Sequence, residues 1–180
     1  MKLSIILKII GVLAVIIICG LVYTLFINPA SPRGSSEIKK ESLVMAVDYS
    51  RPYKKNRLIF GELADEALVP FNIYWRLGAN FATTFETNEA ISFAGRSLQA
   101  GKYRMYAVPF NDHWELTLNS DPGAFGYSEP DYNNDIITVN LSSKQMTEII
   151  EQLTIDFIDD SIGTSMRIRW DSTMVLVPLN

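Results

Sequence analysis

The sequence predicts an all-β protein, an antiparallel β-sandwich or jelly-roll-like domain with one short helix, preceded by a single N-terminal transmembrane helix. Three observations predict this class. An apolar run occupies residues 5–27. After Ser42 apolar and polar residues alternate with a period of two, which is typical of strands with one buried face. Turn-forming residues separate these runs at short intervals, as they do in antiparallel sheets.

The N terminus carries a candidate membrane segment behind a short tail at residues 1–4. Residues 5–27 contain one charge, Lys8, and a helix of that length spans about 34 Å, enough to cross a bilayer core. This predicts a transmembrane anchor, or an uncleaved signal. A cleaved signal peptide is the alternative, but the run exceeds the usual roughly 7–15 residues and no small-x-small site follows it. Lipidation of Cys19 is a further alternative, which the bulky Ile18 disfavours.

The orientation of this anchor has to be inferred from short flanking segments. Lys2 and Lys8 lie on one side and Arg33, Lys39 and Lys40 on the other, so the distribution of basic residues does not decide it. A short tail with a Lys is typical of a signal anchor, which places the amino terminus inside. We therefore expect a single-pass, membrane-anchored protein whose domain is extracytoplasmic, in the periplasm or at the cell surface.

A linker and then strands follow the apolar run. Residues 28–41 combine two Pro, one Gly and three Ser with charges, which predicts a flexible linker. Residues 42–180 form the predicted β-sandwich domain, beginning with a strand over 43–49. A two-residue turn at Asn111-Asp112 predicts a hairpin of 103–107 with 114–118. Its register places Met105 opposite Leu118 and Ala107 opposite Leu116.

The C-terminal third contains a further strand at 137–141, the predicted short helix and a meander. Residues 142–152 carry Met146, Ile149 and Ile150 at helical spacing after a Ser cap. Chain reversals are predicted at 159–163 and at Asp171-Ser172. The opposed pairs would be Ile155 with Ile168, Phe157 with Met166, Asp156 with Arg167, Val175 with Ile168, and Val177 with Met166.

Composition excludes several classes of function. The net charge is -4, and residues 42–180 hold 18 of the 20 acids but 11 of the 16 bases. Nucleic acid is therefore not an expected partner, because binding to phosphates needs an excess of Lys and Arg. Cys19 is the single cysteine and His113 the single histidine. An intrachain disulfide and the usual multi-histidine zinc sites are thereby excluded, and the sequence predicts no metal and no cofactor.

Short ordered motifs across the domain resemble the bacterial domain-of-unknown-function family 2911. They cover residues 43–179, and two departures stand out: residues 64–67 (ADEA) look like an insertion, and Phe81 stands where an acid often follows the Gly-Ala-Asn run. The resemblance implies an exported or envelope-associated β-rich domain and no established activity. The motifs are YSRP (49–52), RLIFG (57–61), LVP (68–70), WRLGAN (75–80), AT (82–83), AGKY (100–103), VP (108–109), Trp114, LN (118–119), FG (125–126) and LTIDF (153–157).

Candidate ligand contacts gather in residues 49–86. The basic residues there suit an anionic ligand such as a phosphorylated glycan or a lipid headgroup, or else form a solvated loop. Alternation points Trp75 inward and Arg76 outward, either to a salt bridge with Glu86 or Asp48 or to a ligand. The cluster of bases is Arg51, Lys54, Lys55 and Arg57, and the candidate ligand-binding residues are Arg51, Arg57, Trp75, Arg76, Asn80 and Thr83.

The amide of Asn80 and the hydroxyls of Thr83 and Thr84 suit carbohydrate or peptide recognition, although Asn80 also favours a turn. The long connection at 121–135 holds four acids and two Tyr, but their spacing is not that of a calcium loop.

No catalytic residue is specified. The carboxylates on strand-like segments are Asp48, Glu86 and Glu115, and a facing pair in a cleft would suit a glycosidase. His113, beside a tight turn, is a weaker candidate for a base. The leading hypothesis is a non-catalytic envelope domain that binds a glycan, a peptide or a protein partner. The alternatives are a carbohydrate-active hydrolase and a purely structural interaction domain.

Overall fold

The computed structural model describes residues 3–123, 125–161 and 163–180. Met1 and Lys2 of the predicted tail therefore lie outside the described residues. So do residue 124 of the 121–135 connection and residue 162 of the 159–163 reversal. The chain divides into two compact units, Met1–Pro32 and Arg33–Asn180, and each is described by itself.

The first unit is an apolar helix. α1 (Leu3–Val22) continues into a π-helical turn, η1 (Tyr23–Ile27). None of the residues of α1 is buried, and a helix that is apolar almost all round is unfavourable when it is exposed to water. The helix is long and apolar enough to cross a membrane. It fits a membrane anchor and a signal sequence equally, so secretion or anchoring follows from it.

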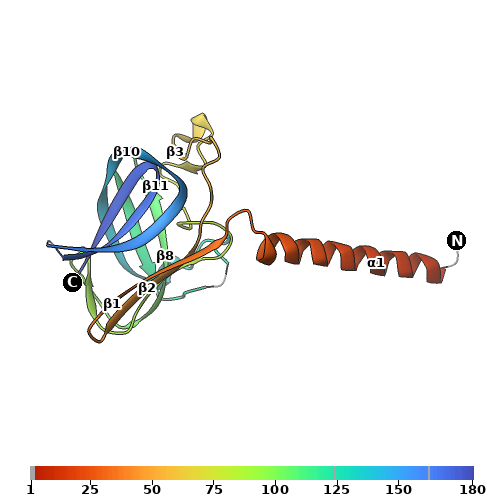
Figure 1. Cartoon of the computed structure of the whole chain (residues 1–180), viewed down its shortest axis with the longest axis horizontal. Coiled ribbons are helices and arrows are strands. Elements are labelled where there is room, and N and C mark those ends of the chain that lie inside the picture. Colours follow the sequence, from red (N-terminus) through yellow and green to blue (C-terminus); the bar gives the residue numbers. More distant parts are fainter. Residues whose placement is uncertain (1–2, 124, 162) are drawn as a thin grey trace. The chain divides into compact units, whose positions relative to one another are not determined.

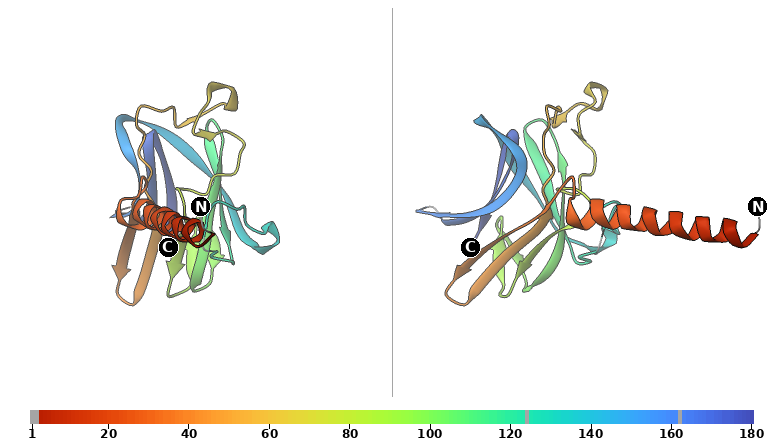
Figure 2. Two further views of the ribbon diagram at one scale, coloured as in Figure 1. Left: turned by 90° about the vertical axis from the view of Figure 1, so that its right-hand side faces the viewer. Right: turned by 45° about the vertical axis from the view of Figure 1, so that its right-hand side comes forward.

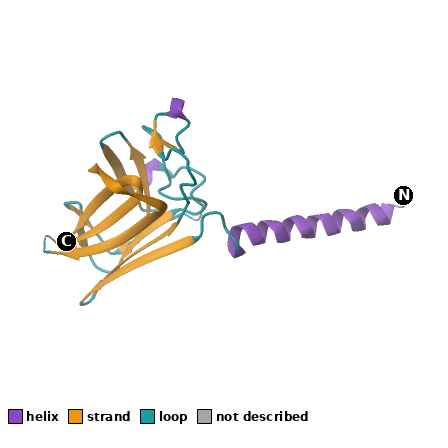
Figure 3. Ribbon diagram, turned by 45° about the horizontal axis from the view of Figure 1, so that its top comes forward, coloured by secondary structure: helices purple, strands orange, loops and turns teal. Residues whose placement is uncertain are grey.

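The second unit is built almost entirely of strands, which Figure 3 shows in orange. Nine of them form one antiparallel sheet, and β3 (Phe60–Gly61) with β4 (Val69–Pro70) forms a small parallel pair. Two short 3-10 helices, η2 (Leu63–Asp65) and η3 (Tyr132–Asn134), lie in connections. In sheet order the nine strands are β1 (Arg33–Lys40), β2 (Leu43–Ser50), β5 (Thr83–Thr87), β8 (Gly101–Pro109), β9 (His113–Asn119), β10 (Asp135–Asp160), β11 (Gly163–Leu179), β6 (Ile91–Phe93) and β7 (Arg96–Leu98). The all-β prediction is confirmed.

Two long strands join the halves of this sheet. The first part of β10 pairs with β9, and its second part pairs with β11. β11 in turn carries β6 at its far end, where Leu179 pairs with Phe93. Figure 1 and Figure 2 show β10 and β11, in blue, curving round together. Most of the registers predicted from alternation are confirmed: Met105 with Leu118, Ala107 with Leu116, Ile155 with Ile168, Phe157 with Met166, and Asp156 with Arg167.

The predicted helix over 142–152 is wrong, because these residues belong to β10. The pairing with β11 shifts between Gln145 and Ile150, so the residues between them bulge out of the ladder. That bulge carries Ile149 into solvent at 55% exposure. A helix of this length depends on packing of its apolar face, whereas the chain on both sides is already held in strand pairing.

The predicted reversal at Asp171-Ser172 is also wrong. β11 runs unbroken through both residues, and Val175 pairs with Ser143 rather than facing Ile168. Asp171 has a φ of 55°, and one left-handed residue within a strand bends it without reversing it.

The predicted linker over 28–41 is wrong for its second half, which forms β1. β1 pairs along its whole length with β2, from Arg33 with Ser50 to Lys40 with Leu43. The strand lies at the edge of the sheet. Backbone hydrogen bonds form without apolar side chains, and polar or charged residues are usual on edge strands. The composition of this segment therefore suits a strand as well as a linker.

The core is a single cluster of apolar side chains contributed by β2, β4 to β11 and the connections between β2 and β5. Phe85, Met105, Leu116 and Ile168 have no exposed surface. Burial of such side chains contributes about 1.5–3 kcal/mol each. The unit Arg33–Asn180 therefore contains its own hydrophobic core and folds around it.

Candidate functional site

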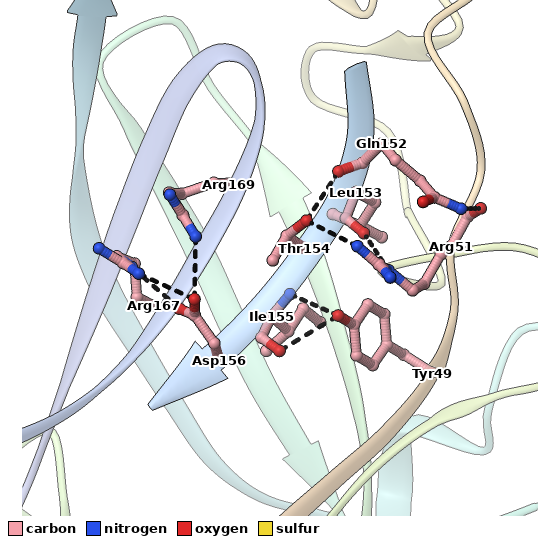
Figure 4. A network of polar contacts seen from close by, with 9 residues as sticks. All are labelled: Tyr49, Arg51, Gln152, Leu153, Thr154, Ile155, Asp156, Arg167 and Arg169. Carbon is pink, nitrogen blue, oxygen red and sulfur yellow. Dashed lines mark hydrogen bonds and ion pairs between the residues drawn. The ribbon is translucent and has the colours of Figure 1, made fainter. Parts of the chain in front are cut away.

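The basic segment predicted as a ligand contact lies along the second part of β10 (Figure 4). The Arg51 guanidinium donates from Nε to the Leu153 carbonyl oxygen at 3.1 Å, and from Nη2 to Thr154 Oγ1 at 3.1 Å. Gln152 Nε2 donates to the Arg51 carbonyl oxygen at 3.0 Å. The charge of Arg51 is thus used within the fold, where it holds the chain that follows β2 against β10.

Tyr49, two residues earlier, makes the same connection without charge. Its hydroxyl donates to the Ile155 carbonyl oxygen at 3.1 Å and accepts from the Ile155 backbone N–H at 2.8 Å. One side chain therefore satisfies two main-chain groups at an edge of β10, as a neighbouring strand would. Burial raises the pKa of Tyr49 above its ordinary value, so the neutral hydroxyl is the stable form.

The other bases of this segment also have partners within the domain. Lys54 Nζ lies 2.6 Å from Asp171 Oδ2, with both side chains at most 20% exposed. The exposed Arg57 side chain donates to the Lys54 carbonyl oxygen at 2.9 Å and to the Tyr53 carbonyl oxygen. At Lys55 the donor is the main-chain N–H, which bonds to a Glu151 carboxylate oxygen at 2.9 Å. These contacts fix the loop between β2 and β3 in one conformation.

Figure 4 also shows two arginines of β11 on the Asp156 carboxylate. Arg167 donates from Nε and Nη2 at 2.9 and 2.8 Å, and Arg169 from Nη2 at 2.9 Å. Burial acts to raise the pKa of Asp156, but the bonds and charges of both arginines outweigh it and hold the pKa below its usual range. The three side chains form an ion cluster that bridges β10 and β11 and extends the predicted Asp156–Arg167 pair.

A cavity of about 270 Å³ opens beside this loop. Its walls come from five parts of the chain: the β2–β3 loop with β3, the segment after β4, the β8–β9 turn with the start of β9, the bulged part of β10 and the bend of β11. The lining residues are Leu58, Phe60, Phe71, Phe110, Asn111, Trp114, Ser143, Gln145, Asp171, Ser172 and Thr173.

Aromatic rings of the cavity lining pack against further rings in the core. Phe60 and Trp114 have ring centroids 5.2 Å apart, and Trp75 meets Trp114 edge-on at 5.4 Å. Trp170 stacks on Trp75 at 6.0 Å. Such contacts favour offset and edge-to-face geometries and hold the rings rigidly. Trp75, predicted to point inward, is 7% exposed, and it supports the lining rings from beneath.

Amide and hydroxyl groups surround the mouth of the cavity. Ser172 Oγ donates to Gln145 Oε1 at 3.0 Å, across the place where the β10 bulge meets the β11 bend. Asn111 and Ser143 add further donors and acceptors. Asp171 is the one carboxylate among the lining residues, and Lys54 engages it. Sequence reasoning missed this cavity, because its residues come from five parts of the chain that are distant in the sequence.

The remaining predicted ligand residues lie together elsewhere. Arg76 has its guanidinium 5.7 Å from the centre of the Tyr127 ring. Asn80 has a φ of 58°, and its carbonyl oxygen accepts from the Gly126 N–H at 2.9 Å. Thr83 is buried, and its hydroxyl donates to the Leu77 carbonyl oxygen at 2.8 Å. Asn80 therefore forms the turn favoured by its side chain, and Thr83 is an internal bond.

The predicted carboxylates do not line the cavity. Asp48 and Glu86 lie on neighbouring strands, 4.0 and 3.4 Å from Lys102 Nζ, with side chains 44% and 54% exposed. The predicted salt bridge from Arg76 to one of them is therefore wrong, because Lys102 takes that place. Glu115 is in β9, opposite Val108 and Asn140.

His113 pairs with its sequence neighbour Asp112 and does not line the cavity. His113 Nδ1 lies 2.7 Å from Asp112 Oδ1, and that hydrogen bond lowers the pKa of Asp112. Among residues 3–123, 125–161 and 163–180 no group of three metal-ligating side chains comes together.

A family model with the description "Protein of unknown function (DUF2911)" matches residues 31–179. No curated protein matches the chain, and no solved structure matches it.

Proposed function

The chain belongs to the DUF2911 family of proteins of unknown function, and we propose that its β domain is a non-catalytic glycan-binding module of the cell envelope. The apolar helix anchors the module in a membrane, with the domain on the extracytoplasmic side. The cavity between β3, β9, β10 and β11 receives the glycan. A protein or peptide partner, and a purely structural role, are the alternatives that the experiment below separates from this proposal.

The composition of the cavity supports this proposal. Sugars present apolar C–H faces, which pack on aromatic rings, and hydroxyl groups, which need both donors and acceptors. Phe60 and Phe110 supply rings, the buried Trp114 packs against Phe60, and Asn111 and Gln145 supply amides. The volume of about 270 Å³ lies just below the usual range for ligand pockets. It therefore suits the end of a glycan rather than a long stretch of one.

The segment predicted as a ligand contact builds one wall of this site. Leu58 lines the cavity directly, and Arg57 and Lys54 fix the loop that precedes it. In this proposal Arg51 and Arg57 position the loop that carries Leu58, and Trp75 packs against the lining ring of Trp114. These three side chains therefore hold the residues that contact the ligand, and do not contact the ligand themselves.

The carboxylates favour binding over hydrolysis. Glycoside hydrolysis commonly uses two carboxyl groups about 5–10 Å apart across the scissile bond. The cavity has Asp171 alone, and its partner is Lys54 at 2.6 Å.

The test is a glycan array probed with residues 33–180, followed by titration of the glycan that binds. Phe110→Ala removes a lining ring, and we expect affinity to fall about threefold to tenfold. Tyr127→Ala is the matched control, because Tyr127 is 83% exposed and lies outside the cavity.

Absence of binding to every glycan would contradict the proposal and favour the structural role or a protein partner. Equal affinity in both variants would place the site elsewhere. Release of new reducing ends from the bound glycan would show a hydrolase.

A further inference from the structure

A second surface of the β domain exposes aromatic side chains. Phe125 is 62% exposed and Tyr127 83% exposed, both in the long connection between β9 and β10. Isolated exposed apolar residues are common on proteins, but aromatic rings grouped on one loop indicate contact with another surface. Neither ring lines the cavity proposed for glycans.

Two arginines stack on this group of rings. The Arg33 guanidinium lies 5.3 Å from the centre of the Phe81 ring, and Phe81 stacks on Phe125 at 5.1 Å. The Arg76 guanidinium lies 5.7 Å from the centre of the Tyr127 ring. The Arg76 guanidinium thus contacts the Tyr127 ring directly, and the Arg33 guanidinium is linked to the Phe125 ring through Phe81. We call Arg33, Phe81, Phe125, Arg76 and Tyr127 the aromatic–arginine surface.

The loop is held in place from the β domain. The Gly126 N–H donates to the Asn80 carbonyl oxygen at 2.9 Å, and Phe81 and Phe125 form an isolated β-bridge. A Cβ at Gly126 would lie 3.0 Å from Arg76 Cδ and 3.1 Å from the Phe81 carbonyl oxygen. The close packing at Gly126 fixes Phe125 and Tyr127 on either side of it.

One residue of this surface, Arg33, is joined to the apolar helix by a short segment of the chain. Arg33 is the first residue of β1, and residues 28–32 alone separate it from the end of η1 at Ile27. A segment of that length reaches at most about 22 Å. Arg33 is therefore joined to the end of η1 by this short segment, and the Phe81–Phe125 stack lies next to Arg33 within the β domain.

We propose that the aromatic–arginine surface docks on the lipid headgroups of the membrane that the helix enters. Tyr and other aromatic rings favour the headgroup level of a bilayer, and arginines bind lipid phosphates through paired N–H donors. The proposal depends on the anchoring role proposed above and goes beyond it, because it assigns a membrane-binding role to the β domain itself.

The acids of the loop define the kind of lipid surface. Glu129 in the loop accepts from Tyr132, and Asp135, which follows the loop as the first residue of β10, accepts from Tyr106 and Asn119. These carboxylates keep the loop from being basic overall, so attraction to an anionic surface does not drive docking. Ring insertion and phosphate contacts remain, and both are available in a phosphatidylcholine bilayer.

The experiment uses the full chain, with Cys19→Ser, reconstituted into phosphatidylcholine vesicles. Nitroxide labels are placed one at a time by Ser128→Cys beside the surface, by Val12→Cys in α1, and by Ala64→Cys in η2. Ser128 and Ala64 are both exposed, and Ala64 is the matched control because its neighbour Leu63 is an exposed apolar residue. Paramagnetic resonance compares the accessibility of each label to oxygen, which concentrates in lipid, and to a water-soluble nickel chelate.

We expect the label at residue 12 to be lipid-exposed, the label at 128 to lie at the interface, and the label at 64 to be in water. The double variant Phe125→Ser with Tyr127→Ser should move the label at 128 into water and leave the other two unchanged. Equal water exposure at 128 and 64, with residue 12 in lipid, would overturn the docking proposal alone. A label at 12 in water would overturn the anchor and the docking together.

Discussion

The hydroxyl of Tyr49 gives the sharpest test of how β2 is connected to β10. Tyr49→Phe removes one oxygen and keeps the ring, which is 3% exposed. That oxygen bonds both the N–H and the carbonyl oxygen of Ile155, at 2.8 and 3.1 Å. The substitution therefore leaves one buried donor and one buried acceptor without this partner.

The expected loss of unfolding free energy follows from these two groups. An unsatisfied buried polar group costs about 1–3 kcal/mol, and the backbone N–H is the harder of the two to leave unpaired. We expect Tyr49→Phe to lower the unfolding free energy by about 2–3 kcal/mol. In a domain of about 150 residues that corresponds to a fall in Tm of roughly 5–10 °C.

The assay is urea unfolding of residues 33–180, with Tyr103→Phe as the matched control. Tyr103 is also buried, and its hydroxyl makes one local bond to the Gln99 carbonyl oxygen at 2.9 Å. We expect this control to lose about 0.5–1.5 kcal/mol. Equal losses in the two variants, or a change below about 0.5 kcal/mol for Tyr49→Phe, would refute the reasoning.

The same variant has a pH signature. Burial raises the pKa of Tyr49 in the folded chain, so the stabilisation by its hydroxyl is fully present below about pH 10, where the unfolded side chain titrates. It is lost as the pH rises through the raised folded value. The difference between wild type and Tyr49→Phe should therefore shrink in alkali, because the other tyrosines titrate in both proteins.

Two further perturbations test the ion cluster and the turn before β5. Asp156→Asn should cost about 2 kcal/mol near neutral pH, because Arg167 and Arg169 lose the carboxylate they share. The pKa of Asp156 is lowered, so this stabilisation is present above about pH 4 and is lost as the pH falls. Urea unfolding of wild type and Asp156→Asn at neutral and at acidic pH checks this. A difference in unfolding free energy between the two proteins that persists in acid contradicts it. Gly78→Ala would place a Cβ 2.8 Å from the Ser50 carbonyl oxygen. We expect a loss of about 1–3 kcal/mol, measured as a fall in Tm, and an unchanged Tm would show that the backbone moves freely there.

Local pairing was predictable from the sequence where two strands follow one another through a short turn. Met105 and Leu118 meet because only one register of the hairpin puts apolar residues on one face. The same reasoning holds for Ile155 with Ile168, including the charged pair on the opposite face. In such places the alternation of apolar and polar residues and the length of the turn together allow one strand register.

Pairing between distant segments was not predictable in this way. Nothing near Ser143 in the sequence indicates Val175 as its partner, and the bulge after Gln145 hides the alternation that would have shown a strand. Arg33 and its neighbours become a strand because β2 offers a free edge, which no local pattern records. The cavity combines all of these long-range features, and for that reason none of its lining residues was among the candidate ligand-binding residues. Trp75 was a candidate, and it packs against the lining ring of Trp114.

The position of β11 in the sheet has a consequence for the order of events during synthesis. β6 pairs with β11 through Phe93 and Leu179, and the Tyr49 hydroxyl bonds to Ile155, so early segments wait for partners that are synthesised much later. Contacts of such long sequence separation form slowly. A chain whose early strands stay unpaired while the later strands are made remains extended enough to pass through a narrow export channel.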